Sequence, residues 1–185
     1  MGKTKKQSSQ NISNEAEQIW GEEIPNKGTE KLIDYDLIED TTTPTQDGTK
    51  VNEQLADIFL KYKEGTEYRN MVDNLAIQIV PIKNERDPSW EATAQNFLKA
   101  TILSVLYNPK TTLEKFTIGK IKIMCGMGDF SDDPSGNFST KPQILYRYFK
   151  QQPLICRQLA DAVVNNSYNT AKNHLSVLYT YLAKY

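Results

Sequence analysis

The feature that most constrains the fold is the stretch at residues 87–92, which reads Asp-Pro-Ser-Trp-Glu-Ala and predicts the start of a helix. The side chain of Asp87 can accept hydrogen bonds from the first free amides of a helix. Proline at the first helical position gives up no hydrogen bond and already has a helical φ angle. Glu91 places a negative charge near the positive end of the helix dipole. Together these features predict a helix that begins at Pro88.

The residues that follow repeat at spacings of three and four, as one apolar face of a helix requires. This face comprises Trp90, Ala94, Phe97, Leu98, Thr101, Ile102, Val105 and Leu106. Because Pro109 disfavours helical backbone at Asn108, the helix is expected to end near Tyr107. We expect the helix at 88–107 to be central to the core. The side chains expected to be buried are Trp90, Phe97, Leu98, Ile102 and Val105.

Helical spacing of apolar residues continues on both sides of this segment. The other predicted helices lie at about 51–64, 66–80, 117–126, 141–151 and 155–182. Gly65 and Pro81 are expected to end the first two, and Thr66 to cap the second. The last segment is either one long helix or two helices joined near residues 165–167. Since signals for β-strands are sparse, the expected fold class is all-α, a compact helical bundle.

The first 50 residues differ from the rest and are predicted to form a flexible, polar and acidic arm and linker. Residues 1–13 lack the apolar area that would offset the entropy of ordering, so we expect them to be mobile. Residues 41–49 contain proline and glycine and predict a linker. The all-α helical domain is therefore expected to span residues 51–185.

Charged residues are distributed unevenly along the chain, although they nearly cancel to a formal net charge of −1. Residues 14–40 hold nine acidic residues and two lysines, whereas residues 141–185 hold six lysines and arginines and one acid, Asp161. Such a basic region is typical either of solvated helix faces or of a surface that binds DNA or an acidic protein. In the second interpretation the candidate partner-binding residues are Lys141, Arg147, Lys150, Arg157 and Lys172.

Aromatic residues accompany these cations near the C-terminus. They are Tyr146, Tyr148, Phe149, Tyr168, Tyr179, Tyr181 and Tyr185. Aromatic side chains interleaved with cations are typical of surfaces that bind single-stranded nucleic acid, where bases stack on the rings. Several of these residues fall at inward helical positions, so packing in the core explains them at least as well.

Patterns for catalysis and metal binding are sparse. His174 is the only histidine and borders the last apolar face, so we expect a boundary residue and not a general base. Cys125 and Cys156 lack the further ligands of a zinc site, and buried free thiols in a reducing compartment are expected, although the sequence leaves their pairing open. The acidic loop at 129–133 lacks the glutamate that ends a calcium loop. We therefore expect no metal, no cofactor, no nucleotide hydrolysis and no enzyme activity.

The sequence carries no targeting or membrane-spanning signal. No apolar run follows the basic and polar N-terminus, as a signal peptide would require. No stretch approaches the ~18 apolar residues of a spanning helix. We therefore expect a soluble, cytoplasmic segment without membrane contact.

The helix start at residue 87 and its apolar run also form a motif that is known from one family. The motif is an Asp-Pro-x-Trp-Glu start followed by an alanine and apolar residues, here Asp87, Pro88, Trp90, Glu91, Ala94, Phe97, Leu98, Ile102 and Leu103. It resembles the all-α domain of type IV secretion coupling proteins, the ATPases of conjugative DNA transfer. Residues 75–79 resemble the family's helix upstream of the motif, and residues 116–118 resemble the start of its next helix.

The resemblance implies a domain that is inserted in the motor domain of its parent protein, over the cytosolic mouth of the ATPase ring. Its partners would be a relaxase or another relaxosome protein, DNA, and that motor domain, at the cytoplasmic face of the bacterial membrane. The membrane helices, phosphate-binding loop and acidic metal-binding strand of a whole coupling protein are not in this sequence. The chain is therefore expected to be an excised domain or a divergent relative without a motor. The alternative is a freestanding helical DNA-binding or regulatory protein that uses residues 141–172 as its contact face.

Overall fold

The structure is a computed structural model that describes residues 43–83, 85–126 and 143–185. The chain divides into two units, Met1–Ile33 and Asp34–Tyr185, and all described residues belong to the second. The described residues form seven α-helices and one 3-10 helix without any β-strand, which confirms the all-α prediction for this part of the chain. The expectations for residues 1–13 and for the acidic loop at 129–133 fall outside the described residues.

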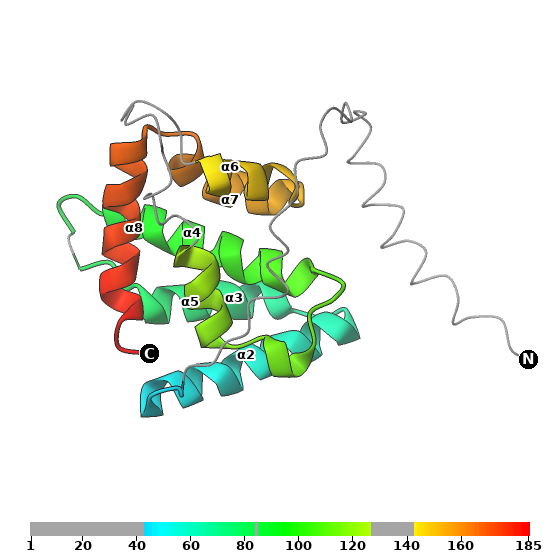
Figure 1. Ribbon diagram of the computed structural model, residues 1–185. Helices are drawn as coiled ribbons and strands as arrows, with labels where there is room; N and C mark the ends of the chain where they lie inside the picture. Colours follow the sequence, from blue (N-terminus) through cyan, green and yellow to red (C-terminus); the bar gives the residue numbers. More distant parts are fainter. Residues whose placement is uncertain (1–42, 84, 127–142) are drawn as a thin grey trace, which may run out of the picture. The chain divides into compact units, whose positions relative to one another are not determined.

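The helices pack around α4, which runs through the middle of the unit (Figure 1). The elements are α2 (Gln46–Glu64), α3 (Tyr68–Ile79), α4 (Ser89–Tyr107), a 3-10 turn (Leu113–Lys115), α5 (Ile118–Gly126), α6 (Gln143–Lys150), α7 (Leu154–Val164) and α8 (Tyr168–Leu182). In Figure 1, α2 and α3 lie on one side of α4 and the pair α6 and α7 lies on the other. Helices α3, α5, α7 and α8 all contact α4 directly.

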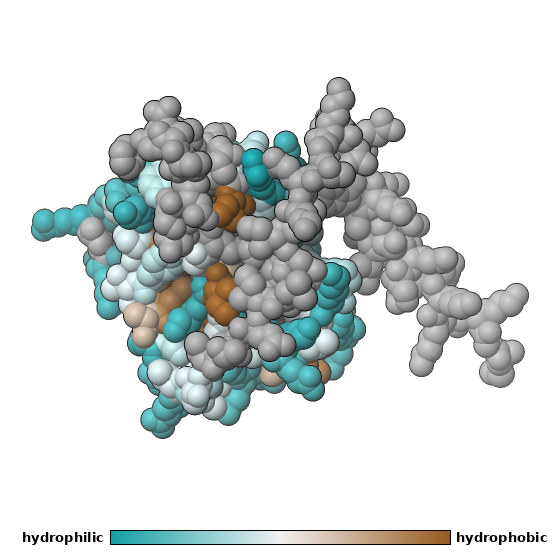
Figure 2. Space-filling model, viewed as in Figure 1, coloured by the Kyte–Doolittle hydropathy of each residue, from teal (hydrophilic) through white to brown (hydrophobic). Residues whose placement is uncertain are grey.

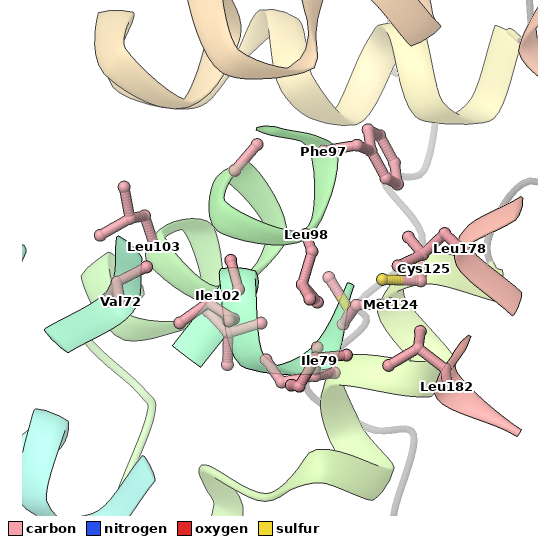
Figure 3. Close-up of a cluster of buried hydrophobic side chains, with 14 of the residues drawn as sticks. Val72, Ile79, Phe97, Leu98, Ile102, Leu103, Met124, Cys125, Leu178 and Leu182 are labelled. Carbon is pink, nitrogen blue, oxygen red and sulfur yellow. The ribbon is translucent and has the colours of Figure 1, made fainter. Parts of the chain in front are cut away.

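Helix α4 is buried on nearly all sides, as a central helix must be. Twelve of its 19 residues are buried. Figure 3 shows Leu98 and Ile102 of α4 among apolar side chains of α3, α5 and α8, including Ile79 and Met124. The core therefore lies around α4, as the sequence predicts.

One of the five predicted core side chains of α4 is not fully buried. Phe97, Leu98, Ile102 and Val105 are at most 4% exposed, whereas Trp90 is half-buried. Trp90 lies in the first turn, at the edge of the core, where its ring packs against His174 of α8 with 4.5 Å between ring centres. The apolar spacing identified its side of the helix but not how far the core reaches.

The start of α4 follows the sequence expectation to within one residue. The helix begins at Ser89, with Pro88 as the N-cap residue. A carboxylate oxygen of Asp87 accepts a hydrogen bond from the Ser89 amide at 3.3 Å. Hydrogen bonds from Ser89 lower the pKa of Asp87, so this side chain stays ionised at the positive end of the helix.

The boundary between linker and helical domain lies earlier than predicted. Helix α2 begins at Gln46, so the linker prediction was wrong for residues 46–49. Thr45 caps this helix, because its Oγ1 accepts a hydrogen bond from the Gly48 amide at 3.0 Å. The same Oγ1 donates to the carbonyl of Lys184 at 3.0 Å. Gly48, which suggested a linker, instead lies where the start of α2 closely approaches the residues after α8.

Gly48→Ala is expected to give no net stabilisation, although alanine is favoured over glycine by about 1 kcal/mol inside a helix. A Cβ at residue 48 would lie 2.7 Å from the carbonyl oxygen of Tyr185, so this carbonyl would have to move. We also expect faster amide exchange at residues 183–185. The measurements are a thermal melt and hydrogen exchange.

The control for this prediction is Gly126→Ala at the end of α5, where a Cβ meets nothing within 4 Å. If both alanine variants raise the melting temperature equally, the close approach at Gly48 has no energetic consequence.

The turn between α2 and α3 differs in one detail from the prediction. Gly65 ends α2 with a φ angle of 74°, as expected. Thr66, however, does not cap α3, which begins at Tyr68. The amide and Oγ1 of Thr66 both donate to the carbonyl of Lys61, at 3.0 and 3.3 Å. Thr66 therefore closes the end of α2 and is not available to the next helix.

The C-terminal region contains two helices and not one, which decides between the two alternatives left open by the sequence. Helix α7 ends at Val164, and Ser167 caps α8. Thr117 caps α5, since its Oγ1 accepts a hydrogen bond from the Lys120 amide at 3.1 Å. Every helix within the described ranges is too short or too polar to cross a lipid bilayer.

Candidate binding site between α6 and α7

Helix α6 has one strongly apolar face and one charged face. Leu145 and Phe149 are buried, while Arg147 and Lys150 are exposed. The ring of Phe149 packs edge to face against Phe97 of α4, with 5.4 Å between ring centres. These contacts hold α6 against the core and leave its cations at the surface.

A cleft of about 530 Å³ opens between α6 and α7. It is lined by Tyr146, Phe149, Lys150, Leu154, Arg157, Gln158, Asp161, Val164 and Asn165. The residues from α7 follow one another at helical spacing, so a single face of this helix forms one wall. Phe149 and Val164 are buried and form the apolar part, whereas Leu154 is 41% exposed.

The charges in the cleft are of mixed sign. The Nζ of Lys150 lies 5.9 Å from the ring centre of Tyr146, one turn earlier on α6. Arg157 of α7 is half-buried. One turn beyond it, the exposed Asp161 accepts a hydrogen bond from Asn165 Nδ2 at 2.5 Å. Among the described residues, the cleft therefore offers two cations, one carboxylate and two side-chain amides around an apolar floor.

Of the five predicted partner-binding residues, the cleft contains Lys150 and Arg157. Arg147 is exposed on α6 but does not line the cleft. Lys172 is exposed on α8, also outside the lining. Lys141 lies outside the described residues. Two of the predicted cations thus line the same cleft, and Arg147 and Lys172 are not part of its lining.

The neutral half of the cleft was not predicted from the sequence. Leu154, Gln158 and Asn165 line it, but none of them carries a charge that would draw attention to it. The available signal was their spacing on the predicted helix, which places them on the same face as Arg157 and Asp161.

Most of the aromatic residues near the C-terminus contribute to packing and internal hydrogen bonds. Phe149 and Tyr185 are buried. The hydroxyl of Tyr148 donates to Ser104 Oγ at 3.0 Å, and that of Tyr179 donates to the carbonyl of Cys125 at 2.9 Å. Core packing therefore explains a large part of the aromatic content that the sequence offered as a stacking surface.

A second group of aromatic rings and cations lies where α2, α3 and α4 meet. The rings of Tyr62, Tyr68 and Tyr107 are 5.3 to 6.4 Å apart. The hydroxyls of Tyr68 and Tyr107 are 3.0 Å apart and share a hydrogen bond. Burial, and then this hydrogen bond, raise the pKa of Tyr107 far above its usual range. Because the half-buried rings pack against one another, this group is a structural cluster.

His174 is a boundary residue, half-buried on α8, and burial lowers its pKa below the ordinary value of 6.5. The protonated form is therefore disfavoured in the folded chain. The stabilising contribution of neutral His174 is present above its unfolded pKa and is lost as the pH falls through the folded pKa.

We expect the imidazole of His174 to titrate with a midpoint below 6.5 in the folded chain. Its proton resonance can be followed by NMR without ambiguity, since the sequence has one histidine. Trp90→Ala removes the ring beside it and should move the midpoint towards 6.5. A midpoint at or above 6.5 in the unmodified chain would contradict the effect of burial.

Cys125 and Cys156 are free, buried thiols on different helices. Within the described ranges, no group of three or more histidine, cysteine, aspartate or glutamate side chains could hold a metal ion. Comparison with known protein families, with curated proteins and with solved structures found no match for the chain. The features that bear on function are therefore the cleft, the packing of the helices and the sequence motif of α4.

Proposed function

We propose that the chain is a substrate-docking domain of a conjugative type IV secretion coupling protein. It binds a relaxase, another relaxosome protein or DNA, and it has no catalytic activity of its own. The observation that carries the proposal is that the three segments resembling this family pack together. Residues 87–103 form the start and body of α4, residues 75–79 lie on α3, and residues 116–118 lead into α5. Both α3 and α5 contact α4.

The ends of the helical unit also support the proposal. The hydrogen bond from Thr45 to Lys184 holds the start of α2 beside the last residues after α8, as can be followed in Figure 1. Domains whose ends lie close together are readily inserted into a loop of another domain. In this proposal the motor domain of the parent protein joins the unit at these ends. The parent protein then keeps the unit at the cytoplasmic face of the membrane.

The surface is compatible with docking of a charged partner. On the face shown in Figure 2, the residues that are not grey are mainly hydrophilic, with a few brown apolar side chains between them. A docking domain for a nucleoprotein needs cations near an apolar contact. The cleft provides this combination through Lys150 and Arg157 beside Leu154.

The experiment that tests the proposal compares three partners. These are the relaxase of the same conjugative element, the relaxase joined to its cleaved DNA strand, and the naked DNA strand. We expect the chain to bind at least one relaxase form with a dissociation constant below about 10 μM, which corresponds to roughly −7 kcal/mol. The double variant Lys150→Glu/Arg157→Glu should weaken this binding more than tenfold, while Lys172→Glu should not.

Failure to bind either relaxase form at ~100 μM would refute docking of a relaxase. Binding of naked DNA alone, with an affinity that falls steeply with salt, would instead favour a freestanding DNA-binding protein.

A further inference from the structure

We propose that the cleft between α6 and α7 binds a short protein segment in which an acidic residue is next to an apolar one. This inference rests on the proposed function and deepens it, because it assigns the cleft to protein and not to DNA. Three observations carry it: the size of the cleft, its exposed apolar edge and the order of its charges.

The size of the cleft fits a few residues of polypeptide. From Leu154 to Asn165 the wall formed by α7 is about 16 Å long, at 1.5 Å rise per residue. An extended chain rises about 3.3 Å per residue, so roughly five residues span this wall. The volume of about 530 Å³ lies within the range that holds small ligands and peptide side chains, ~300–1,000 Å³.

The apolar part of the cleft has a buried floor and an exposed edge. Phe149 and Val164 are buried beneath it, at 1% and 4% exposed, while Leu154 at its edge is 41% exposed. An apolar side chain placed there would remove the exposed part of Leu154 from water, which is favourable. This edge selects a partner that carries an apolar anchor and not charge alone.

The order of the charges favours a peptide over a phosphate backbone. Lys150 ends α6 and Arg157 lies in the first turns of α7, so both can attract one carboxylate at this end of the cleft. Asp161 follows one turn later and would repel the next phosphate of a nucleic acid strand. A peptide meets the same carboxylate with backbone N–H groups, which are donors.

Tyr146, which lines the cleft, is also poorly suited to stacking with bases. Lys150 Nζ lies over the ring of Tyr146 at 5.9 Å from its centre, so a cation already occupies one face of this ring. Binding of single-stranded nucleic acid depends on ring faces that are open to bases. The ammonium group of Lys150, held over the ring of Tyr146, can pair with a carboxylate that approaches it from the solvent.

The test uses four labelled probes and the full chain, with binding measured by fluorescence anisotropy at physiological salt. The first probe is a ten-residue peptide that alternates aspartate and leucine. The second has lysine for each aspartate, the third has serine for each leucine, and the fourth is a ten-nucleotide oligothymidine. We expect a dissociation constant of about 10–100 μM for the first probe, and at least tenfold weaker binding of the other three.

Variants then locate the site. Lys150→Glu/Arg157→Glu should weaken binding of the first probe at least tenfold, and Leu154→Ser should weaken it several-fold without a change of charge. Asp161→Asn removes the carboxylate that repels phosphates, so it should strengthen binding of the oligothymidine and not that of the first probe. Lys172→Glu is the matched control, because this exposed lysine lies outside the cleft, and it should leave the affinity unchanged. Circular dichroism and a thermal melt confirm that each variant is folded.

The inference is overturned if the first peptide does not bind the unmodified chain or binds no better than the other peptides. It is also overturned if Lys172→Glu weakens binding as much as the double variant does. Tighter binding of the oligothymidine, lost in the double variant, would make the cleft a nucleic-acid site. Relaxase binding that survives the double variant would leave the proposed function intact and refute the cleft as its site. Peptide binding without any relaxase binding would support the cleft as a peptide site and refute docking of a relaxase.

Discussion

Replacing Phe97 by alanine is expected to lower the free energy of unfolding by about 3–5 kcal/mol. Phe97 is fully buried, at 0% exposed, and its ring meets Phe149 edge to face. Truncation removes the transfer free energy of the ring and leaves a cavity between α4 and α6. Because domains of this kind are stable by only about 5–15 kcal/mol, the variant should be close to unfolding at ambient temperature. Urea denaturation followed by circular dichroism measures the difference.

The control for this prediction is Leu60→Ala on α2. Leu60 is also a large apolar residue on a helix, but it is 49% exposed, so its truncation should change stability by about 0.5 kcal/mol or less. Phe97→Leu keeps much of the buried volume and should fall between the two. Equal destabilisation by Phe97→Ala and Leu60→Ala would show that α4 is not the centre of the core.

The central helix could be predicted from sequence because several local signals agree on it. Asp87, the following proline and the apolar spacing all indicate the same helix, and tertiary structure did not have to decide between them. Gly65 is a similar case, since a glycine at φ 74° ends α2 for reasons that are local to the backbone. Such features are encoded within a few residues and are therefore visible in the sequence.

The errors occurred where a distant segment decides the local structure. Gly48 suggested a linker, yet the carbonyl of Tyr185, far away in sequence, lies close to it and favours a residue without a side chain. Trp90 has the correct spacing for the core, but its position at the end of α4 leaves it half-buried. Thr66 bonds back to α2 and does not cap α3. Periodicity and capping rules use neighbouring residues alone, so they do not predict these contacts between distant parts of the sequence.

The cleft could be predicted only in part for the same reason. Lys150 and Arg157 were selected for their charge, but whether they meet depends on how the short connection at residues 151–153 turns α7 back along α6. Arg147 and Lys150 are three residues apart on α6 and were both selected for their charge, yet of the two only Lys150 lines the cleft. One face of a helix covers about a third of its circumference. Residues that share such a face therefore need not all line the same cleft.

The thiols of Cys125 and Cys156 are expected to react with a disulfide reagent about a thousandfold more slowly in the folded chain than in the unfolded chain. Burial raises the pKa of each thiol from 9.0 to about 12. For Cys125 a hydrogen bond with Thr101 opposes this effect, and for Cys156 its own backbone and Arg69 oppose it. Only the thiolate attacks a disulfide, and at pH 8 its fraction falls about a thousandfold when the pKa rises by three units.

The measurement is the rate of thiol release from 5,5′-dithiobis(2-nitrobenzoate) at pH 8, with and without 8 M urea added as denaturant. The variants Cys125→Ala and Cys156→Ala separate the two thiols. Both thiols should react slowly in the folded chain, because each cysteine is 0% exposed. A folded-state rate within tenfold of the denatured rate would show that at least one thiol is accessible, which its burial contradicts.

The same shifts determine how stability depends on pH in alkaline solution. A thiol whose pKa is higher in the folded than in the unfolded chain binds its proton more tightly when folded, so it stabilises the fold fully below about pH 9. This contribution is lost progressively between about pH 9 and 12, as the unfolded thiols ionise first. Burial raises the pKa of Tyr62 and Tyr107 as well, so the tyrosines add to the loss.

The double variant Cys125→Ala/Cys156→Ala should therefore be less stable at pH 8 but lose less stability than the unmodified chain between pH 9 and 11. Urea denaturation measures the free energy of unfolding at each pH. If this free energy falls equally with pH between 9 and 11 in both proteins, the pKa of the thiols is not higher in the folded chain.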